Sequence, residues 1–281
     1  MGVVRFSGAL PEDSRAEAGI IGIPFDGTTV HRQGAYSGPE AIRKGSQFLE
    51  SYSPFLDRDL KNMDFVDYGD LDVKDTTVEV MITKVTDKVR ELLSKNMRVV
   101  LLGGERTCSL GAIKEFASVN PGLKVLHLDA HADLYEEHNG EKVTHSTVIR
   151  RLLEYIPSES IYRIGVRSGS RKDLVASGLK LPLGFDGGVH DVEAALNSLP
   201  RQSDIYLTLD LDVFDPSLVP GVGNPEPMGM TYREFVQLVR GLTFHNLIGF
   251  DVVELTPEYD PSGISAIVAA SAVRDLMICM M

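Results

Sequence analysis

Two apolar runs of this 281-residue chain end in alternating acidic or imidazole side chains, and this pattern constrains the fold most strongly. The segment LHLDAHADL carries Asp129, His131 and Asp133, and the segment YLTLDLDVFDP carries Asp210 and Asp212. Alternate side chains of a strand share a face, so each run presents its polar groups to one side. We therefore expect two strand ends to form one metal site, suited to one Mn²⁺ or to two ions that share carboxylates.

Strand and helix patterns alternate along most of the chain. Apolar residues at helical spacing and a capping box at Thr231 and Glu234 predict helices, and short apolar runs predict strands between them. Such alternation predicts an α/β fold of three layers, α/β/α, with helices on both faces of a mainly parallel sheet. The predicted strands are residues 99–102, 124–128, 161–166, 205–211 and 247–253, and the predicted helices are residues 78–93, 110–117, 148–155, one from 231 and one from about 264.

Polar clusters follow four of the predicted strands, at residues 103–104, 129–133, 210–212 and 251–254. Ligands of parallel sheets bind beyond the carboxyl ends of the strands, so we expect these clusters to meet at one rim. The alternative for each acidic group is a solvated turn with an aspartate cap. Carboxylates at the ends of buried strands need partners, which favours the metal site.

The composition limits the classes of partner. The net charge is −12, without a block of lysines or arginines, which argues against nucleic acid and favours a small cationic substrate. The two cysteines, Cys108 and Cys279, form no disulfide framework and no zinc-binding spacing. No apolar run approaches the roughly 20 residues of a membrane span, and the start lacks a signal-peptide pattern. We expect a cytoplasmic protein with no membrane segment, folded as a single domain over residues 1–281.

Six ordered segments resemble the ureohydrolases, the arginase and agmatinase family, over nearly the whole chain. The resemblance implies an arginase-like fold, a homo-oligomer (trimer or hexamer) and two Mn²⁺ ions whose bridging hydroxide attacks a guanidinium carbon. The loop YEEHNGEKVTHS resembles agmatinases most, which implies agmatine as substrate, putrescine and urea as products, and a role in polyamine biosynthesis. The six segments are GIPFDGTTVHRQGAYSGPEAIR, LLGGERT, LHLDAHADLYEEHNGEKVTHSTVIRR, RIGVRS, TLDLDVFDPSLVPGVGNPEP and GFDVVELTPEYD.

The resemblance also implies a role for each metal ligand. Asp129 and Asp210 would bridge the two ions. His131 and Asp212 would complete the second ion, and Asp133 would help to hold the first.

Two further residues receive catalytic roles from the resemblance. His145 would shuttle protons, and Glu254 would pair with the substrate guanidinium, a planar cation that a carboxylate orients well. From the residues alone, His145 could equally flank a helix and Glu254 could be an exposed acid at a strand end. Charge complementarity further predicts that Glu136 and Glu137 bind a distal ammonium group of the substrate.

One position departs from the family pattern. Family members have Gly-Gly-(Asp or Glu)-His-Ser where this chain has GGERT, so Arg106 replaces a histidine that ligates the first ion. A guanidinium offers no lone pair, and Arg106 cannot act as a ligand. The four clustered aspartates carry about −4, and one divalent ion plus Arg106 supplies about +3. We hypothesise that Arg106 occupies the first position and that one ion, or none, binds at the second. Alternatively Arg106 points outward and Glu105, Thr107 or water completes the first site.

Three functions compete at this point. The leading hypothesis is metal-dependent hydrolysis of a guanidino compound, impaired to some degree by Arg106. The second is a non-catalytic relative that binds guanidino or polyamine ligands or an active paralogue. A phosphatase- or deacetylase-like hydrolase has less support, because Glu254 and the acidic loop favour a cation.

Overall fold

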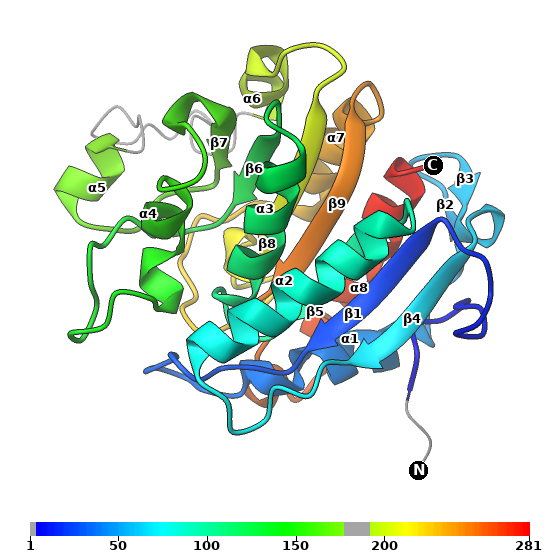
Figure 1. Cartoon of the computed structure of the whole chain (residues 1–281), viewed down its shortest axis with the longest axis horizontal. Coiled ribbons are helices and arrows are strands. Elements are labelled where there is room, and N and C mark those ends of the chain that lie inside the picture. Colours follow the sequence, from blue (N-terminus) through cyan, green and yellow to red (C-terminus); the bar gives the residue numbers. More distant parts are fainter. Residues whose placement is uncertain (1–3, 177–191) are drawn as a thin grey trace.

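A seven-stranded parallel sheet forms the centre of the molecule (Figure 1). The computed structural model describes residues 4–176 and 192–281. All neighbouring strands of the sheet run parallel. In spatial order the strands are β4 (Phe65–Asp70), β1 (Ala18–Ile23), β5 (Arg98–Gly103), β9 (Asn246–Val253), β8 (Asp204–Asp210), β6 (Lys124–Leu128) and β7 (Ile161–Ile164), and a separate antiparallel pair is β2 (Tyr52–Ser53) with β3 (Arg58–Asp59).

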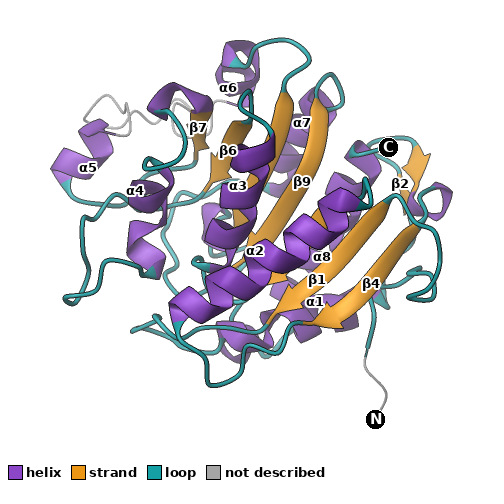
Figure 2. Ribbon diagram, viewed as in Figure 1, coloured by secondary structure: helices purple, strands orange, loops and turns teal. Residues whose placement is uncertain are grey.

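Helices cover both faces of this sheet, which gives three layers (Figure 2). Successive side chains of β5 alternate between two apolar cores. Val99 and Leu101 pack with helices α2, α3 and α4, whereas Val100 and Leu102 pack with α1, α7 and α8. No helix in the described ranges is long and apolar enough to cross a bilayer. The helices are α1 (Gly38–Ser46), α2 (Val78–Ser94), α3 (Cys108–Val119), α4 (Val148–Leu152), α5 (Arg171–Ala176), α6 (Val192–Ser198), α7 (Tyr232–Leu242) and α8 (Ile264–Cys279).

The predicted α/β class and the five predicted strands are confirmed, with ends that differ by two residues or fewer. The predicted capping box is present at the start of α7, where the Thr231 hydroxyl accepts from the Glu234 backbone N–H and the Glu234 carboxylate accepts from the Thr231 N–H. The predicted helix over residues 148–155 ends earlier, at Leu152. Strands β1 and β4 and helix α1 were not predicted.

A buried ion pair fixes helix α1 against the edge strand β4. The Arg43 guanidinium is almost fully buried, and its Nε and Nη2 donate to the two carboxylate oxygens of Asp67 at 2.8 and 2.9 Å. Its Nη1 donates to Asp70 at 2.5 Å. Asp67 also accepts from the backbone N–H of Phe6 at 2.7 Å. The pair therefore connects the N-terminal segment, α1 and β4.

Replacing Arg43 with methionine leaves Asp67 buried without its cation. Such a loss costs about 3–5 kcal/mol of unfolding free energy. The control is Lys44→Met on the same helix, which removes an exposed pair with Glu40 and should change stability by about 0.5 kcal/mol or less. Urea denaturation compares the two variants, and equal midpoints for both would show that the buried pair does not stabilise this edge.

Candidate metal and substrate site

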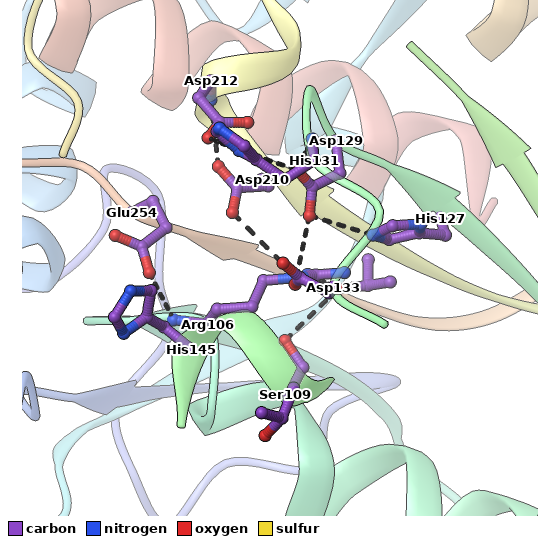
Figure 3. Close-up of polar contacts among 12 residues, drawn as sticks. Arg106, Ser109, His127, Asp129, His131, Asp133, His145, Asp210, Asp212 and Glu254 are labelled. Atoms are coloured by element: carbon purple, nitrogen blue, oxygen red, sulfur yellow. Dashed lines mark hydrogen bonds and ion pairs between the residues drawn. The ribbon is translucent and has the colours of Figure 1, made fainter. Parts of the chain in front are cut away.

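Four adjacent strands bring the predicted polar clusters together at the carboxyl edge of the sheet. Arg106 lies just beyond β5, Asp129 follows β6 directly, Asp210 is the last residue of β8, and Glu254 follows β9. Because these strands are neighbours in the order β5-β9-β8-β6, the side chains converge (Figure 3). This geometry agrees with the expectation that the polar clusters after four strands meet at the carboxyl edge of the sheet.

Backbone hydrogen bonds hold the acidic groups in place. The Asp129 Oδ1 accepts from the backbone N–H of His131 at 2.6 Å, and Asp210 Oδ1 accepts from the N–H of Asp212 at 3.0 Å. The Asp212 Oδ1 accepts from the N–H of Ala130 at 3.0 Å, which joins the two strand ends directly. The aspartates are buried, so their mutual approach is a fixed feature of the fold rather than a solvated turn.

One group of side chains has the spacing of a metal site. His131 Nδ1 lies 2.8 Å from Asp212 Oδ2 and 3.5 Å from Asp129 Oδ1. The ligand atoms of these three residues lie within 4.8 Å of one another. Nitrogen and oxygen donors of this kind suit a divalent ion such as Mn²⁺. These residues, with Asp210 close by, therefore fit one ion at the second position that the resemblance implies.

The side chain of Arg106 points into the cluster, not outward. Only 1% of the residue is exposed, and its Nε lies 3.2 Å from Asp129 Oδ2, 3.3 Å from Asp133 Oδ2 and 4.0 Å from Asp210 Oδ2. Burial lowers the pKa of Arg106, but the charges of these aspartates outweigh it and raise the pKa above its ordinary value. The alternative in which Arg106 swings away from the site does not describe this structure.

The first metal position does not fit an ion while Arg106 is in place. The Asp129 Oδ2 atom, which would have to face that ion, already contacts Arg106 Nε and lies 2.9 Å from His127 Nε2. Burial lowers the pKa of His127 to about 4, so the ring is neutral at pH 7. Asp129 can therefore offer an ion only its other oxygen, and it cannot bridge two ions as the resemblance implies.

Sequence reasoning missed His127, although a signal was present. Its position two residues before Asp129 places it on the same face of β6, by the alternation that identified the aspartates. His127, Asp129 and Asp133 also have ligand atoms within 4.8 Å of one another, but Arg106 contacts both of these aspartates. Within the described residues, His127 Nδ1 is buried and has no hydrogen-bond partner.

A buried hydrogen-bond network holds the Arg106 guanidinium in place. The Arg106 Nη1 donates to the Thr208 hydroxyl at 2.5 Å, and Thr208 donates to Asp251 Oδ1 at 2.7 Å. The Ser109 hydroxyl donates to the same carboxylate oxygen at 2.9 Å. Burial raises the pKa of Asp251, and the nearby charge of Arg106 opposes that rise. This network orients the guanidinium towards the aspartates, and neither Thr208 nor Ser109 was predicted.

The carboxylates around His131 favour its protonated form. Burial lowers the pKa of His131, but Asp212 and Asp129 outweigh it and raise the value to about 12. Burial and neighbouring carboxylates raise the pKa of Asp133 and of Asp210. An ion that binds at the second position would displace the proton from His131 Nδ1.

The two predicted catalytic residues line the cavity above the cluster. Glu254 is buried, and its Oε1 accepts from the backbone N–H of Arg106 at 2.7 Å. Burial raises its pKa, as does the neighbouring Glu105. His145 lies at the start of a short 3-10 helix, His145–Thr147, and burial lowers its pKa. Neither residue is exposed, although His145 does flank a helix.

The structure does not bring Glu136 and Glu137 to the cavity. Both are exposed, and neither is among the lining residues. The Glu136 carboxylate instead pairs with Arg150 Nε at 2.6 Å and Arg151 Nη2 at 3.2 Å. The negative charge of Glu136, on which the prediction depended, is thus neutralised by two arginines of α4. The geometry gives no support to a substrate-binding role for Glu136 or Glu137.

Replacing Thr208 with valine tests the buried network. The change keeps the shape of the side chain but removes the hydroxyl between Arg106 and Asp251, so both charged groups lose a partner. We expect the unfolding free energy to fall by about 2 kcal/mol or more. Thr83→Val, at an exposed position on α2, should have an effect of about 0.5 kcal/mol or less. Thermal or urea unfolding provides the comparison, and an equally small effect of Thr208→Val would count against the network.

The family of this chain follows from comparison with known proteins. A model of the arginase family matches residues 16–279, and the chain belongs to this family. The predicted resemblance to the ureohydrolases is therefore confirmed, and the chain has the arginase-like α/β fold.

Its similarity to agmatinases extends over most of its length. An agmatinase from Halalkalibacterium halodurans is 33% identical over 273 residues, which cover 94% of this chain and 92% of that protein. The structure of the agmatine ureohydrolase of Thermoplasma volcanium matches with a TM-score of 0.88 at 28% identity. The match covers 100% of this chain and 95% of that chain. Proclavaminate amidino hydrolase from Streptomyces clavuligerus has a TM-score of 0.89 at 27% identity, with coverage of 100% and 97%.

Proposed function

We propose that this chain hydrolyses the amidino group of a guanidino compound, with agmatine as substrate and putrescine and urea as products. The observation that carries the proposal is the position of Glu254. Its carboxylate lies in the same cavity as Asp212, which belongs to the group that fits one metal ion. A guanidinium-binding acid next to a metal site is the arrangement that hydrolysis of such a cation requires.

The charges around the cavity favour a cationic substrate. In the part of the chain that the structure describes, five acids line it: Asp133, Asp173, Asp210, Asp212 and Glu254. Among the described lining residues, the cations Arg106 and His131 are already paired with aspartates. A substrate carboxylate would find no free cation here, whereas the ammonium group of agmatine meets a negative field. This supports agmatine over arginine without the contribution first assigned to Glu136 and Glu137.

Two residues of the chain would perform the binding and proton steps, and four would hold the metal ion. Glu254 would hold the guanidinium plane through Oε2, because its Oε1 already accepts from the Arg106 N–H. His145, which lines the same cavity, would transfer a proton to the departing amine. Asp129, His131 and Asp212, with Asp210, would hold one Mn²⁺ ion, which when bound supplies a water of lowered pKa.

Arg106 also favours a second candidate function, that of a non-catalytic relative. The Arg106 guanidinium lies against Asp129 and Asp133, so the chain would hold one ion where the resemblance implies two. A non-catalytic relative would keep the fold, the acidic cavity and the affinity for guanidino or polyamine ligands, without turnover. It would act as a binding protein or as a partner of an active paralogue.

The resemblance supplies further predictions that stay open. It implies a homo-oligomer, a trimer or a hexamer, a place in polyamine biosynthesis and a cytoplasmic location. Nucleic acid and membranes are not expected as partners.

Glu254→Gln tests the proposed substrate contact. The amide loses the charge that pairs with the guanidinium, so kcat/KM for urea release from agmatine should fall roughly 10- to 150-fold, the worth of a charged hydrogen bond. Glu141→Gln, in an exposed loop, is the control and should behave as the natural chain. If Glu254→Gln released urea at the natural rate, Glu254 would not bind the substrate.

Arg106→His tests the metal content and separates the two functions. We expect the natural chain to bind no more than one Mn²⁺ per chain and the variant to bind two, because the new imidazole offers a lone pair at the first position. Metal analysis after dialysis counts the ions, and urea release is assayed on both proteins. Two tightly held ions in the natural chain would refute the single-ion proposal.

The assay then chooses between the functions. Activity in both proteins means that single-ion chemistry suffices. Activity only in Arg106→His favours the non-catalytic relative.

A further inference from the structure

Glu105, the neighbour of Arg106, is fully buried and collects four hydrogen bonds from three threonines. Its Oε1 accepts from the Thr28 hydroxyl at 2.7 Å and the Thr107 hydroxyl at 2.5 Å. Its Oε2 accepts from the Thr28 backbone N–H at 2.7 Å and the Thr29 hydroxyl at 3.0 Å. A carboxylate that accepts on both oxygens fixes the direction of every donor around it. In particular, the single hydroxyl hydrogen of Thr28 points to Glu105.

Thr28 connects this carboxylate to His145. The Thr28 hydroxyl oxygen accepts from the backbone N–H of His145 at 2.9 Å. The Thr28 carbonyl oxygen lies 3.0 Å from His145 Nδ1. A carbonyl oxygen has no hydrogen to give, so Nδ1 must be the donor of this bond. The Thr28 hydroxyl is also 3.5 Å from Nδ1, but its hydrogen is already directed to Glu105.

These contacts determine which ring nitrogen of His145 carries the proton. We propose that Glu105 is a positioning residue which, through Thr28, holds His145 in the Nδ1–H tautomer and so leaves a lone pair on Nε2. His145 lines the cavity, so Nε2 is the nitrogen that can accept and pass on a proton there. The inference rests on the proposed function only where it assigns proton transfer to Nε2. The tautomer itself is a property of the protein without substrate.

The tautomer can be observed directly. Full-length protein labelled with ¹⁵N in histidine is examined by long-range ¹H–¹⁵N correlation, and the His145 signals are assigned by their loss in His145→Asn. We expect a protonated Nδ1 and an unprotonated Nε2 in the natural chain. A His145 ring with its hydrogen on Nε2 would overturn the inference without any variant.

Glu105→Gln tests the role of the carboxylate at unchanged size. The Oε2 site faces a backbone N–H that cannot accept, so the amide NH₂ must take the Oε1 site and donate to the Thr28 hydroxyl. That hydroxyl is then free to turn its hydrogen to Nδ1, where it competes with the hydrogen bond from Nδ1–H to the Thr28 carbonyl. We expect the ¹⁵N signals of His145 to move towards the Nε2–H form.

Thr28→Ser is the matched control, because it keeps both the hydroxyl and the carbonyl. It should give the tautomer of the natural chain. If Glu105 only anchored the loop around Thr28, Glu105→Gln would leave the His145 tautomer unchanged, and the inference would fail.

Urea release separates this inference from the proposed function. If the natural chain releases urea from agmatine, Glu105→Gln should lower kcat about 10-fold or more with little change in KM, because proton transfer and not binding is affected. An Nδ1–H ring in a natural chain that releases no urea would contradict the proposed hydrolysis but not the assigned tautomer. A shift of that tautomer in Glu105→Gln would then still support the positioning role of Glu105.

Discussion

The ion pairs between Arg106 and the aspartates are the interaction on which the rest of the site depends. Several carboxylates meet at the edge of the sheet, and burying them without cations would cost more than the fold can supply. Arg106 is a cation that cannot dissociate, and Thr208 and Asp251 hold it in place. The cluster is therefore held together by groups of the protein itself. At the first metal position that the resemblance implies, this chain carries a covalently attached positive charge.

The site therefore has two parts, which differ in whether their donor atoms are still available to a metal ion. The part around Arg106 is rigid, because Asp129 Oδ2 is also fixed by His127. The part around His131 and Asp212 keeps donor atoms that an ion can use. Above both, Glu254 and His145 line the cavity, each held by the segment next to Arg106. Glu254 accepts from the Arg106 backbone, and His145 is oriented through Thr28 by Glu105. Glu254, His145 and Arg106 are therefore held by one continuous segment of the chain and its contacts.

Much of the fold could be predicted from sequence because helices and buried strands have different periods. Strand β6 was predicted to the residue, since the run at 124–128 is bounded by polar groups. Strand β1 was missed because AGIIGI contains two glycines, and β4 was missed because FVDYGD carries acids in a buried strand. Asp67 is tolerated there only because Arg43 reaches it from α1, a contact that no local pattern reveals. The convergence of the aspartates was predictable by alternation, and the inward direction of Arg106 was predictable by charge balance. The pairing of Glu136 with α4 was not, because it depends on a distant segment.

The position of the ion and of the arginine can be measured in one experiment. Crystals of the natural chain grown with excess Mn²⁺ would be measured at the manganese absorption edge. The account predicts one anomalous peak, between Asp129 Oδ1, His131 Nδ1 and Asp212, with the Arg106 guanidinium still against Asp129 and Asp133. Two peaks bridged by Asp129, with the Arg106 side chain displaced from the cluster, would contradict it.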